Sequence, residues 1–477
     1  MDRDNLKTLL ITANVGSLFD HKHLLQPWLK NLFQAISDKD PDLIAVHCQE
    51  IGGKNFTKSM PNVDSWISEL MTSEALKLYD KARIFLDRDY EAHDTFTALG
   101  SLYFVHARVP DVALWDFNKS RFVQLRDRFE HRGPIEAVGE VEKRKFPLKF
   151  FPNQVLSRKG YMRTRWRAGV ATFDLVNVHL FHDASNLDGL SQTPSVYARH
   201  RRDALMWILD QLRSGPPVKD EFAIAASSGS GVKGVEDGGE SLSAERLPVP
   251  SFVFGDFNFR LNLEAYVKTV TQKCRRTEQR DKDGHLSIEY YRGDDRVLTV
   301  GKKQFHSCTH SREFFENKHI WLGQLDFEPS SFDSSLFEFP VTFPPTYPFS
   351  EGASERDATE YMATRLPAWC DRVLCSSSAR SAILCPPEDP TQYGVLGLQD
   401  CMGDHKPVYL YTLLCYGASA ADSHCLMENA DFPPPALLSR LLEQPGVQVK
   451  MSERNGAIYT HVRRDGATIC IFKETAV

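Results

Sequence analysis

Long hydrophobic runs are missing from this sequence. Its longest apolar stretch, VYLYTLLCY from Val408, is too short to cross a bilayer as a helix. The N-terminal sequence MDRDNLKTLLITANVG places acidic residues before a short apolar run, which is not the arrangement of a signal peptide. We therefore expect a cytoplasmic, soluble protein without a transmembrane segment, which a partner could recruit to the membrane periphery.

Cysteine pairs with metal-binding spacing and an excess of positive charge are also missing. The ten cysteines include no Cys-x-x-Cys pair and no zinc-finger spacing, so we expect reduced packing thiols and no zinc. With 57 Lys and Arg against 63 Asp and Glu, the net charge is −6. This balance gives no general case for a nucleic-acid partner, so any anion site must be local.

Short apolar strands alternate with longer, partly helical segments through most of the chain. The clearest helix is 195–214, where apolar residues recur at helical spacing. This mixture favours one α/β domain over several small ones. The expected strands are 7–15, 41–50, 98–108, 168–182, 251–259, 370–376 and 405–415.

Two regions interrupt this pattern. Residues 213–248 are rich in Gly, Ser and Glu, which is typical of a flexible insertion in the main domain, 1–416. Residues 417–440 resemble a linker. In the extension at 441–477, GAIYTHVRRDGATICIF predicts a β-hairpin with Asp-Gly in its turn.

Polar side chains stand at the ends of several expected strands. The stretch SFVFGDFNFRLN at 251–262 begins as a buried strand and then places Asp256, Asn258 and Arg260 on one face. An isolated match of this kind is most simply a turn or a structural ion pair. Polar residues at several strand ends are instead the layout of an active site on the edge of a sandwich. The other residues of this kind are Asn14, Gln49, Glu50, Asn177, His179, His182, Asp404 and His405.

The residue types indicate phosphate-ester hydrolysis. The carboxylate of Glu50, with oxygens from Asn14 and Asp404, suits a Mg²⁺ ion that is completed by water and substrate phosphate. Asp256, held apart from the metal, could deprotonate a water.

A histidine and a carboxylate extend this set. His405 could place positive charge against a phosphoryl oxygen. Asp371 in PAWCDRVL is the obvious carboxylate to orient its ring.

Three sequence blocks, GDFNFRL at 255–261, PAWCDRVL at 367–374 and GDHKPVY at 403–409, resemble the signature blocks of the inositol polyphosphate 5-phosphatases. These are members of the magnesium-dependent endonuclease/exonuclease/phosphatase superfamily. The similarity extends through TANVGSLF, HCQEIGGKN, SRKGYMRTRW, DLVNVHLFHDASN and FPPTYP, and is greatest to the type I enzymes that act on soluble inositol phosphates. It covers 7–416 apart from the insertion.

The resemblance implies a four-layer sandwich of two β-sheets flanked by helices. It implies the metal, base and histidine roles given above, and adds that Asn258 and His179 hold the pentavalent phosphoryl group. Arg260 would brace this polar layer.

A basic segment, SRKGYMRTRWR, could bind the phosphate groups that are not cleaved, because each of them needs directed donors. The alternative for an isolated segment is a solvated basic strand edge. The substrate-binding residues that we expect are Arg158, Lys159, Arg163, Arg165, His182, Arg372 and Lys406.

One departure from the wider family concerns the residues that usually bind the 4-phosphate. Members that act on membrane phosphoinositides carry lysines where this chain has Pro348 and Ala363, which leaves Tyr347 and Arg365. The resemblance therefore points to inositol 1,4,5-trisphosphate and 1,3,4,5-tetrakisphosphate as leading substrates.

The C-terminal sequence FKETAV has no cysteine four residues from its end, so it lacks the prenylation box common in type I enzymes. The ending resembles a ligand of PDZ domains, with an ordinary frayed tail as the alternative.

The sequence thus predicts a Mg²⁺-dependent 5-phosphatase that ends calcium-release signals. One alternative is a nuclease of the same superfamily, which would need a long basic groove. The other is an inactive inositol-phosphate-binding scaffold, against which stands the presence of Glu50, Asp256, Asp371, Asp404 and His405.

Overall fold

The computed structural model describes most of the chain. Of the expected insertion only 213–214 lie within the described residues, and almost all of the 417–440 linker and the last three residues of the tail lie outside them. The described ranges are 4–151, 157–214, 249–308, 311–316, 319–332, 335–352, 354, 357–386, 388–417, 447–454, 457–464 and 467–474.

The first sheet is built around the N-terminal strand. Strand β1 (Asn5–Asn14) runs parallel to β2 (Leu43–Gln49) and antiparallel to β20 (Val408–Cys415). The strand order is β18-β20-β1-β2-β4-β3-β7, with β19 paired to β20. The remaining strands are β3 (Lys81–Leu86), β4 (Gly100–Val105), β7 (Arg128–Glu130), β18 (Ile383–Leu384) and β19 (Gln392–Val395).

The second sheet has the order β16-β17-β11-β10-β9-β5-β6, with β8 paired to β9. Strand β10 (Ala171–His179) runs parallel to β11 (Ser251–Asp256), which is antiparallel to β17 (Asp371–Ser376). The remaining strands are β5 (Val112–Asp116), β6 (Arg121–Gln124), β8 (Glu142–Lys145), β9 (Gly160–Ala168) and β16 (Leu336–Phe337).

Alternating side chains join these sheets and their helices into layers. In β1, Leu6 and Leu10 belong to the core between the sheets, whereas Leu9 and Ile11 pack with residues of α1 (Leu25–Lys39) and α2 (Phe56–Thr72).

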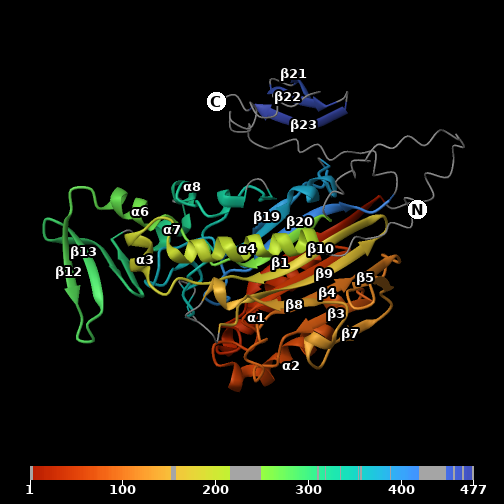
Figure 1. Ribbon diagram of the computed structural model, residues 1–477, viewed down its shortest axis with the longest axis horizontal. Helices are drawn as coiled ribbons and strands as arrows, with labels where there is room; N and C mark the ends of the chain where they lie inside the picture. Colours follow the sequence, from red (N-terminus) through yellow and green to blue (C-terminus); the bar gives the residue numbers. More distant parts are fainter. Residues whose placement is uncertain are drawn as a thin grey trace, which may run out of the picture.

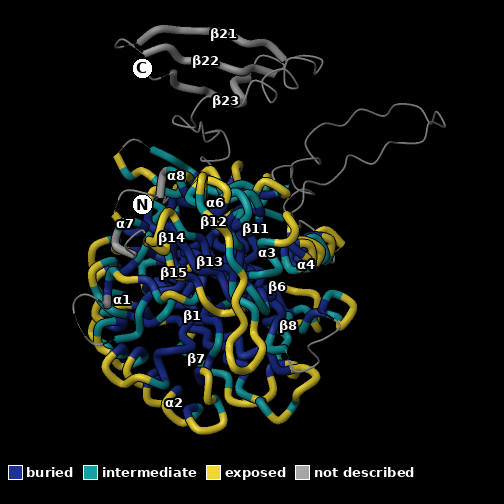
Figure 2. The backbone as a smooth tube through the Cα atoms, turned by 90° about the vertical axis from the view of Figure 1, so that its left-hand side faces the viewer, coloured by how far each residue is buried: buried dark blue, intermediate teal, exposed yellow. Residues whose placement is uncertain are grey.

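The second sheet packs in the same way against α4 (Val196–Ser214), the helix predicted over 195–214. Figure 1 shows the helices on the outer faces, and Figure 2 shows the strands buried between them. The expected four-layer sandwich is confirmed.

A four-stranded antiparallel sheet lies at one end of the molecule, beside the helices α3 (Asn186–Ser191) and α6 (Leu263–Val270) (Figure 1). We did not predict it, because its first strand is almost entirely polar and exposed and shows no apolar alternation. Its strands are β12 (Arg275–Arg280), β13 (Leu286–Arg292), β14 (Asp295–Gly301) and β15 (Gln304–Ser307). Two short helices follow, α7 (Ser311–Glu316) and α8 (His319–Gly323).

The C-terminal extension contains a separate three-stranded sheet. Strands β22 (Ala457–Arg464) and β23 (Ala467–Glu474) pair antiparallel where the sequence predicts a hairpin, and β21 (Val447–Arg454) adds a strand that we did not predict.

Within the described ranges, none of the helices combines the length and the hydrophobicity needed to cross a membrane. The cysteines at 48, 274, 308, 370, 375, 385, 401 and 415 are free thiols.

Candidate active site

The polar residues at the strand ends come together across both sheets. The pairing of β10, β11 and β17 places His179, Asp256 and Asp371 side by side. On the other sheet, Asn14 pairs with Gln49, directly before Glu50. Because the ends of neighbouring strands meet at one edge, side chains that are distant in the sequence converge there.

The carboxylate of Asp256 lies at the centre of this cluster. Its Oδ2 accepts a hydrogen bond from Asn14 Nδ2 at 3.0 Å and lies 3.2 Å from His179 Nε2, and its Oδ1 accepts from the backbone N–H of Asn258 at 2.9 Å. Burial would raise the pKa of Asp256, but the hydrogen bond from His179 and the charge of His405 outweigh it and lower the pKa. Asp256 is therefore ionised and can accept a proton or a hydrogen bond.

His405 and Asp371 form a buried pair next to Asp256. The distance from His405 Nδ1 to Asp371 Oδ2 is 2.8 Å, and Asp371 Oδ2 also accepts from Thr346 Oγ1 at 2.7 Å. Burial would lower the pKa of His405, but Asp371 and then Asp256 raise it to about 10. We assign the proton of the pair to His405, because its ring faces two carboxylates.

Glu50 lies near three basic side chains. Its Oε2 lies 3.7 Å from Arg158 Nη2, its Oε1 lies 3.9 Å from His179 Nε2, and Lys159 Nζ contacts the same His179 nitrogen. Burial would raise the pKa of Glu50, but the charges of His179, Arg158 and Lys159 lower it to about 2. Burial lowers the pKa of Lys159 to about 8.

The oxygen atoms of Asn14 and Glu50 face a space that Gly16 leaves open. A Cβ atom at Gly16 would lie 2.6 Å from Glu50 Oε2 and 3.2 Å from Asn14 Oδ1. Carboxylate and amide oxygens are the donors that Mg²⁺ takes in proteins, so the residues present fit such an ion. The third expected ligand, Asp404, accepts from Ser17 Oγ at 2.7 Å and lies 3.5 Å from Lys54 Nζ.

Potential ligand atoms of Asp256, Asp371 and His405 also lie within 4.8 Å of one another. In this second group, however, His405 Nδ1 is already engaged by Asp371. The ligand set of Asn14, Glu50 and Asp404 stays a prediction.

Asn258 has an uncommon backbone conformation that is fixed by its neighbours. Its φ is 53°, in the left-handed region, as is that of Glu50 at 59°. Its side-chain Nδ2 donates to Leu180 O at 3.1 Å, and its Oδ1 accepts from Arg260 Nη2 at 2.8 Å. Arg260 thus braces Asn258, as the sequence predicts.

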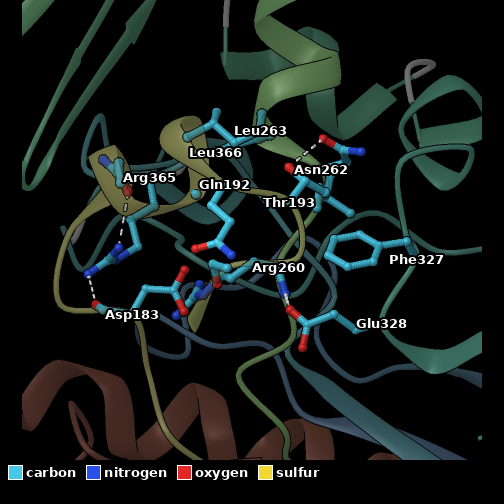
Figure 3. Close-up of a pocket in the computed structure, with 14 residues that line it drawn as sticks. Asp183, Gln192, Thr193, Arg260, Asn262, Leu263, Phe327, Glu328, Arg365 and Leu366 are labelled. Atoms are coloured by element: carbon cyan, nitrogen blue, oxygen red, sulfur yellow. Dashed lines mark hydrogen bonds between the residues drawn. The ribbon is translucent and has the colours of Figure 1, made fainter. Parts of the chain in front are cut away.

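A cavity adjoins this cluster on the side of Arg260 (Figure 3). Arg365 lines this cavity and donates to Asn186 Oδ1 at 3.0 Å and to Asp183 O at 2.6 Å. Tyr347 stands between the two parts of the site, with Arg260 4.9 Å from its ring centre and the His405 ring 4.4 Å away.

His182 lies at the same place and reaches solvent. Desolvation, followed by the charges of Lys159, Arg260 and Arg365, lowers the pKa of His182 to about 3. A neutral ring at this position can donate one hydrogen bond to a phosphate.

The structure contradicts the phosphate-binding role that we expected for Arg163 and Arg165. Both side chains are 2% exposed, and both bind the buried carboxylate of Asp174 on the neighbouring strand, at 2.7 and 2.8 Å. Two guanidinium groups that are enclosed in this way stabilise the sheet and cannot reach a substrate.

The same correction applies to Arg372 and Lys406. Arg372 is 1% exposed and binds Asp326 at 2.5 Å and Glu338 at 2.8 Å. Lys406 is buried and donates to backbone oxygens of Gly397 and Asp400. Arg372 follows Asp371, and Lys406 follows His405. Consecutive side chains of an extended chain point to opposite sides, so Arg372 and Lys406 point away from the site that Asp371 and His405 face.

Several polar residues of the site were missed. Thr346 hydrogen-bonds to Asp371, and its place in the block FPPTYP was the available signal. Lys54 lies 2.7 Å from Glu351, and Ser17 bonds both Glu351 and Asp404. No sequence pattern singles out Glu351.

Comparisons with known proteins place the sequence in a family. Residues 318–411 match the family model described as Endonuclease/Exonuclease/phosphatase family 2. The human protein named inositol polyphosphate-5-phosphatase A is 38% identical over 423 residues, which cover 87% of this chain and 95% of that protein. The Caenorhabditis elegans protein named probable type I inositol 1,4,5-trisphosphate 5-phosphatase is 34% identical over 444 residues, covering 84% and 98%.

Among solved structures, the 5-phosphatase domain of SPsynaptojanin, in complex with inositol (1,4)-bisphosphate and calcium ion, aligns with 87% of this chain and 86% of that chain at 15% identity and a TM-score of 0.43. The two curated relatives are matched over almost their whole length at 34% and 38% identity. The chain therefore belongs to the type I inositol polyphosphate 5-phosphatases, within the endonuclease/exonuclease/phosphatase superfamily.

Proposed function

We propose that the protein hydrolyses the 5-phosphate of inositol 1,4,5-trisphosphate and inositol 1,3,4,5-tetrakisphosphate with Mg²⁺, and so ends calcium-release signals in the cytoplasm. The observation that carries this proposal is the contact of Asp256 with Asn14 and His179 beside the His405–Asp371 pair. The names of the curated relatives support the reaction class.

Asn14, Glu50 and Asp404 would hold the Mg²⁺ ion, which when bound supplies positive charge to the phosphoryl oxygens. Asp256 accepts a hydrogen bond from the attacking water and takes its proton as the water oxygen bonds to phosphorus. The bond from phosphorus to the ring oxygen breaks, and the leaving ring oxygen takes a proton from solvent. The lowered pKa of Asp256 keeps the carboxylate ionised for this step at neutral pH.

Three other side chains hold the phosphoryl group during the attack. Asn258 donates one N–H to Leu180 O, which leaves the other N–H of the amide for a phosphoryl oxygen. His179 lies beside the base, and His405 carries the positive charge that stabilises the developing negative charge. Asp371 keeps the His405 ring oriented and protonated.

The phosphate groups that are not cleaved meet a compact set of donors. We assign this role to Arg158, Lys159, His182, Tyr347 and Arg365, which surround the cluster on two sides. Burial of Arg163 and Arg165 makes the basic surface smaller than the sequence suggests. A short basic surface fits a small soluble anion better than a nucleic acid, which needs contacts along many phosphates.

Two parts of the functional hypothesis lie outside the described residues. A PDZ-domain partner would engage the C-terminal Glu-Thr-Ala-Val, of which 475–477 are not described. Recruitment to the membrane periphery would depend on that partner.

One substrate panel tests this proposal. Phosphate release is measured from inositol 1,4,5-trisphosphate, the tetrakisphosphate, phosphoinositide micelles and single-stranded DNA, each with Mg²⁺ and with EDTA. We expect release from the two soluble inositol phosphates with Mg²⁺ only. A preference for micelles or cleavage of DNA would contradict the proposed substrate class.

A further inference from the structure

The side chain of Asn186 joins the four-stranded sheet to the candidate active site. Its Nδ2 lies 3.1 Å from Gly301 O, 3.1 Å from Gln304 O and 2.9 Å from Thr364 O, while its Oδ1 accepts from Arg365. Its backbone N–H donates to Lys302 O at 3.1 Å. Asn186 is only 6% exposed, so these contacts form a closed junction between α3, the β14–β15 turn and the segment before Arg365.

The β14–β15 turn is held against the same segment by a second contact. The backbone N–H of Phe305 donates to Ala363 O at 2.9 Å, two residues before Arg365. The backbone after the turn is therefore attached directly to the chain that carries Arg365, and the backbone before the turn is attached to it through Asn186. A movement of the four-stranded sheet would shift that chain.

Arg365 needs such an anchor because another guanidinium lies close to it. Arg260 and Arg365 line the same cavity, and burial followed by the charge of Arg260 lowers the pKa of Arg365. The Arg365 guanidinium donates to Asn186 Oδ1 and to Asp183 O, and Figure 3 shows it beside Asp183 at the cavity that Arg260 also lines. Without the oxygen of Asn186, Arg365 would lose the contact that fixes one end of its guanidinium group.

We propose that Asn186 is a positioning residue for Arg365, and that through it the β14–β15 turn sets the affinity of the site for phosphate groups that stay on the inositol ring. This inference rests on the proposed function, in which Arg365 binds such a group. It gives the four-stranded sheet a role in substrate affinity. The other role open to Asn186 is purely structural, as the first residue of α3.

Asn186→Ala separates these two roles when two ligands are compared. Inositol 1,4-bisphosphate carries the ring phosphates that remain after cleavage, whereas inorganic phosphate occupies only the position of the cleaved group. We expect KM for the trisphosphate and Ki for the bisphosphate to rise at least about tenfold, the loss typical of one hydrogen bond to a charged group. The value of kcat and the Ki of inorganic phosphate should stay within about twofold.

A double-mutant cycle shows whether Asn186 acts through Arg365. In an Arg365→Met background, Asn186→Ala should leave KM and both Ki values unchanged, because the group that it positions is gone. Asn31→Ala is the matched control, since Asn31 also donates two hydrogen bonds, to Pro27 O and Asp400, but lies outside the cavity. This control should change none of the three constants.

Several results would overturn the inference. One is an equal loss of affinity for inositol 1,4-bisphosphate and for inorganic phosphate. The others are a fall in kcat without a rise in KM, and additive effects of Asn186→Ala and Arg365→Met. If Asn186→Ala does not fold, Asn186→Ser takes its place with the same expectations. Failure of the proposed function is distinguishable, because the wild-type protein would then release no phosphate and bind no bisphosphate.

Discussion

His405 Nδ1 lies 2.8 Å from Asp371 Oδ2, and both side chains are buried beside Asp256. The two carboxylates keep the imidazole protonated, with a pKa of about 10. A permanent cation at this position is the electrostatic part of the proposed mechanism, since it faces the place where charge develops on the phosphoryl group.

Asp371→Asn should remove most of that cation. The neutral amide no longer favours the imidazolium, so the pKa of His405 should fall well below 10, and kcat should fall at least about a hundredfold. NMR titration of the histidine rings, recorded in EDTA, measures the pKa, and single-turnover kinetics measures the chemical step. A protonated His405 at pH 8 in the variant would contradict this role of Asp371.

Gly16→Ala should weaken binding of the metal without unfolding the protein. The new Cβ would lie 2.6 Å from Glu50 Oε2, so this carboxylate must move from its present place. We expect the dissociation constant for Mg²⁺, measured by calorimetry, to rise at least about tenfold. Gly323→Ala is the control, because nothing lies within 4 Å of the added atom. Equal Mg²⁺ affinity in the two variants would remove Glu50 from the ligand set.

Arg163→Met should reduce stability and leave substrate affinity intact. It takes one of two guanidinium groups from the buried carboxylate of Asp174, and breaking such a pair costs about 3–5 kcal/mol. Urea unfolding measures this loss, and KM of the folded variant should equal that of the wild-type protein. A raised KM at unchanged stability would restore the phosphate-binding role that the structure contradicts.

His47 should make the protein sensitive to acid. Its ring is fully buried against Phe254, and burial lowers its pKa from 6.5 to about 3. Between these values the unfolded chain binds the proton and the folded chain does not. The contribution of the neutral His47 ring to the free energy of unfolding is therefore complete above pH 6.5. It is lost as the pH falls below that value, by about 1.4 kcal/mol per pH unit.

The variant His47→Gln isolates this effect. The difference in unfolding free energy between wild type and variant, measured in urea at pH 7, 6 and 5, should shrink by about 1.4 kcal/mol per unit below pH 6. His285→Gln, which changes an exposed ring, serves as the control. Parallel curves for the wild type and His47→Gln would show that His47 is protonated in the folded protein.

Much of the site could be predicted from the sequence because its residues stand at the ends of recognisable strands. Apolar runs end or begin at His179, Asp256 and Asp371. A polar side chain at the end of an apolar strand indicates a specific role for that side chain. The register that brings them side by side is a property of the sheet, and the sequence does not show it.

The errors have equally physical causes. Arg163 and Arg165 look like free cations until the strand pairing sets Asp174 opposite Arg165. The four-stranded sheet escaped prediction because β12 is held by backbone pairing and has no apolar face of its own. Asn186 ends the block DLVNVHLFHDASN, but its partners come from two segments that lie more than a hundred residues away, the β14–β15 turn and the chain before Arg365.

The central claim is that Asp256 activates the water that attacks the 5-phosphate. Its most direct test compares Asp256→Asn with the wild-type protein on inositol 1,4,5-trisphosphate in the presence of Mg²⁺, with the product identified by chromatography. We expect the wild type to yield inositol 1,4-bisphosphate, and the variant to bind the substrate with similar affinity while kcat falls at least about a thousandfold. Turnover in the variant at the wild-type rate would contradict the mechanism.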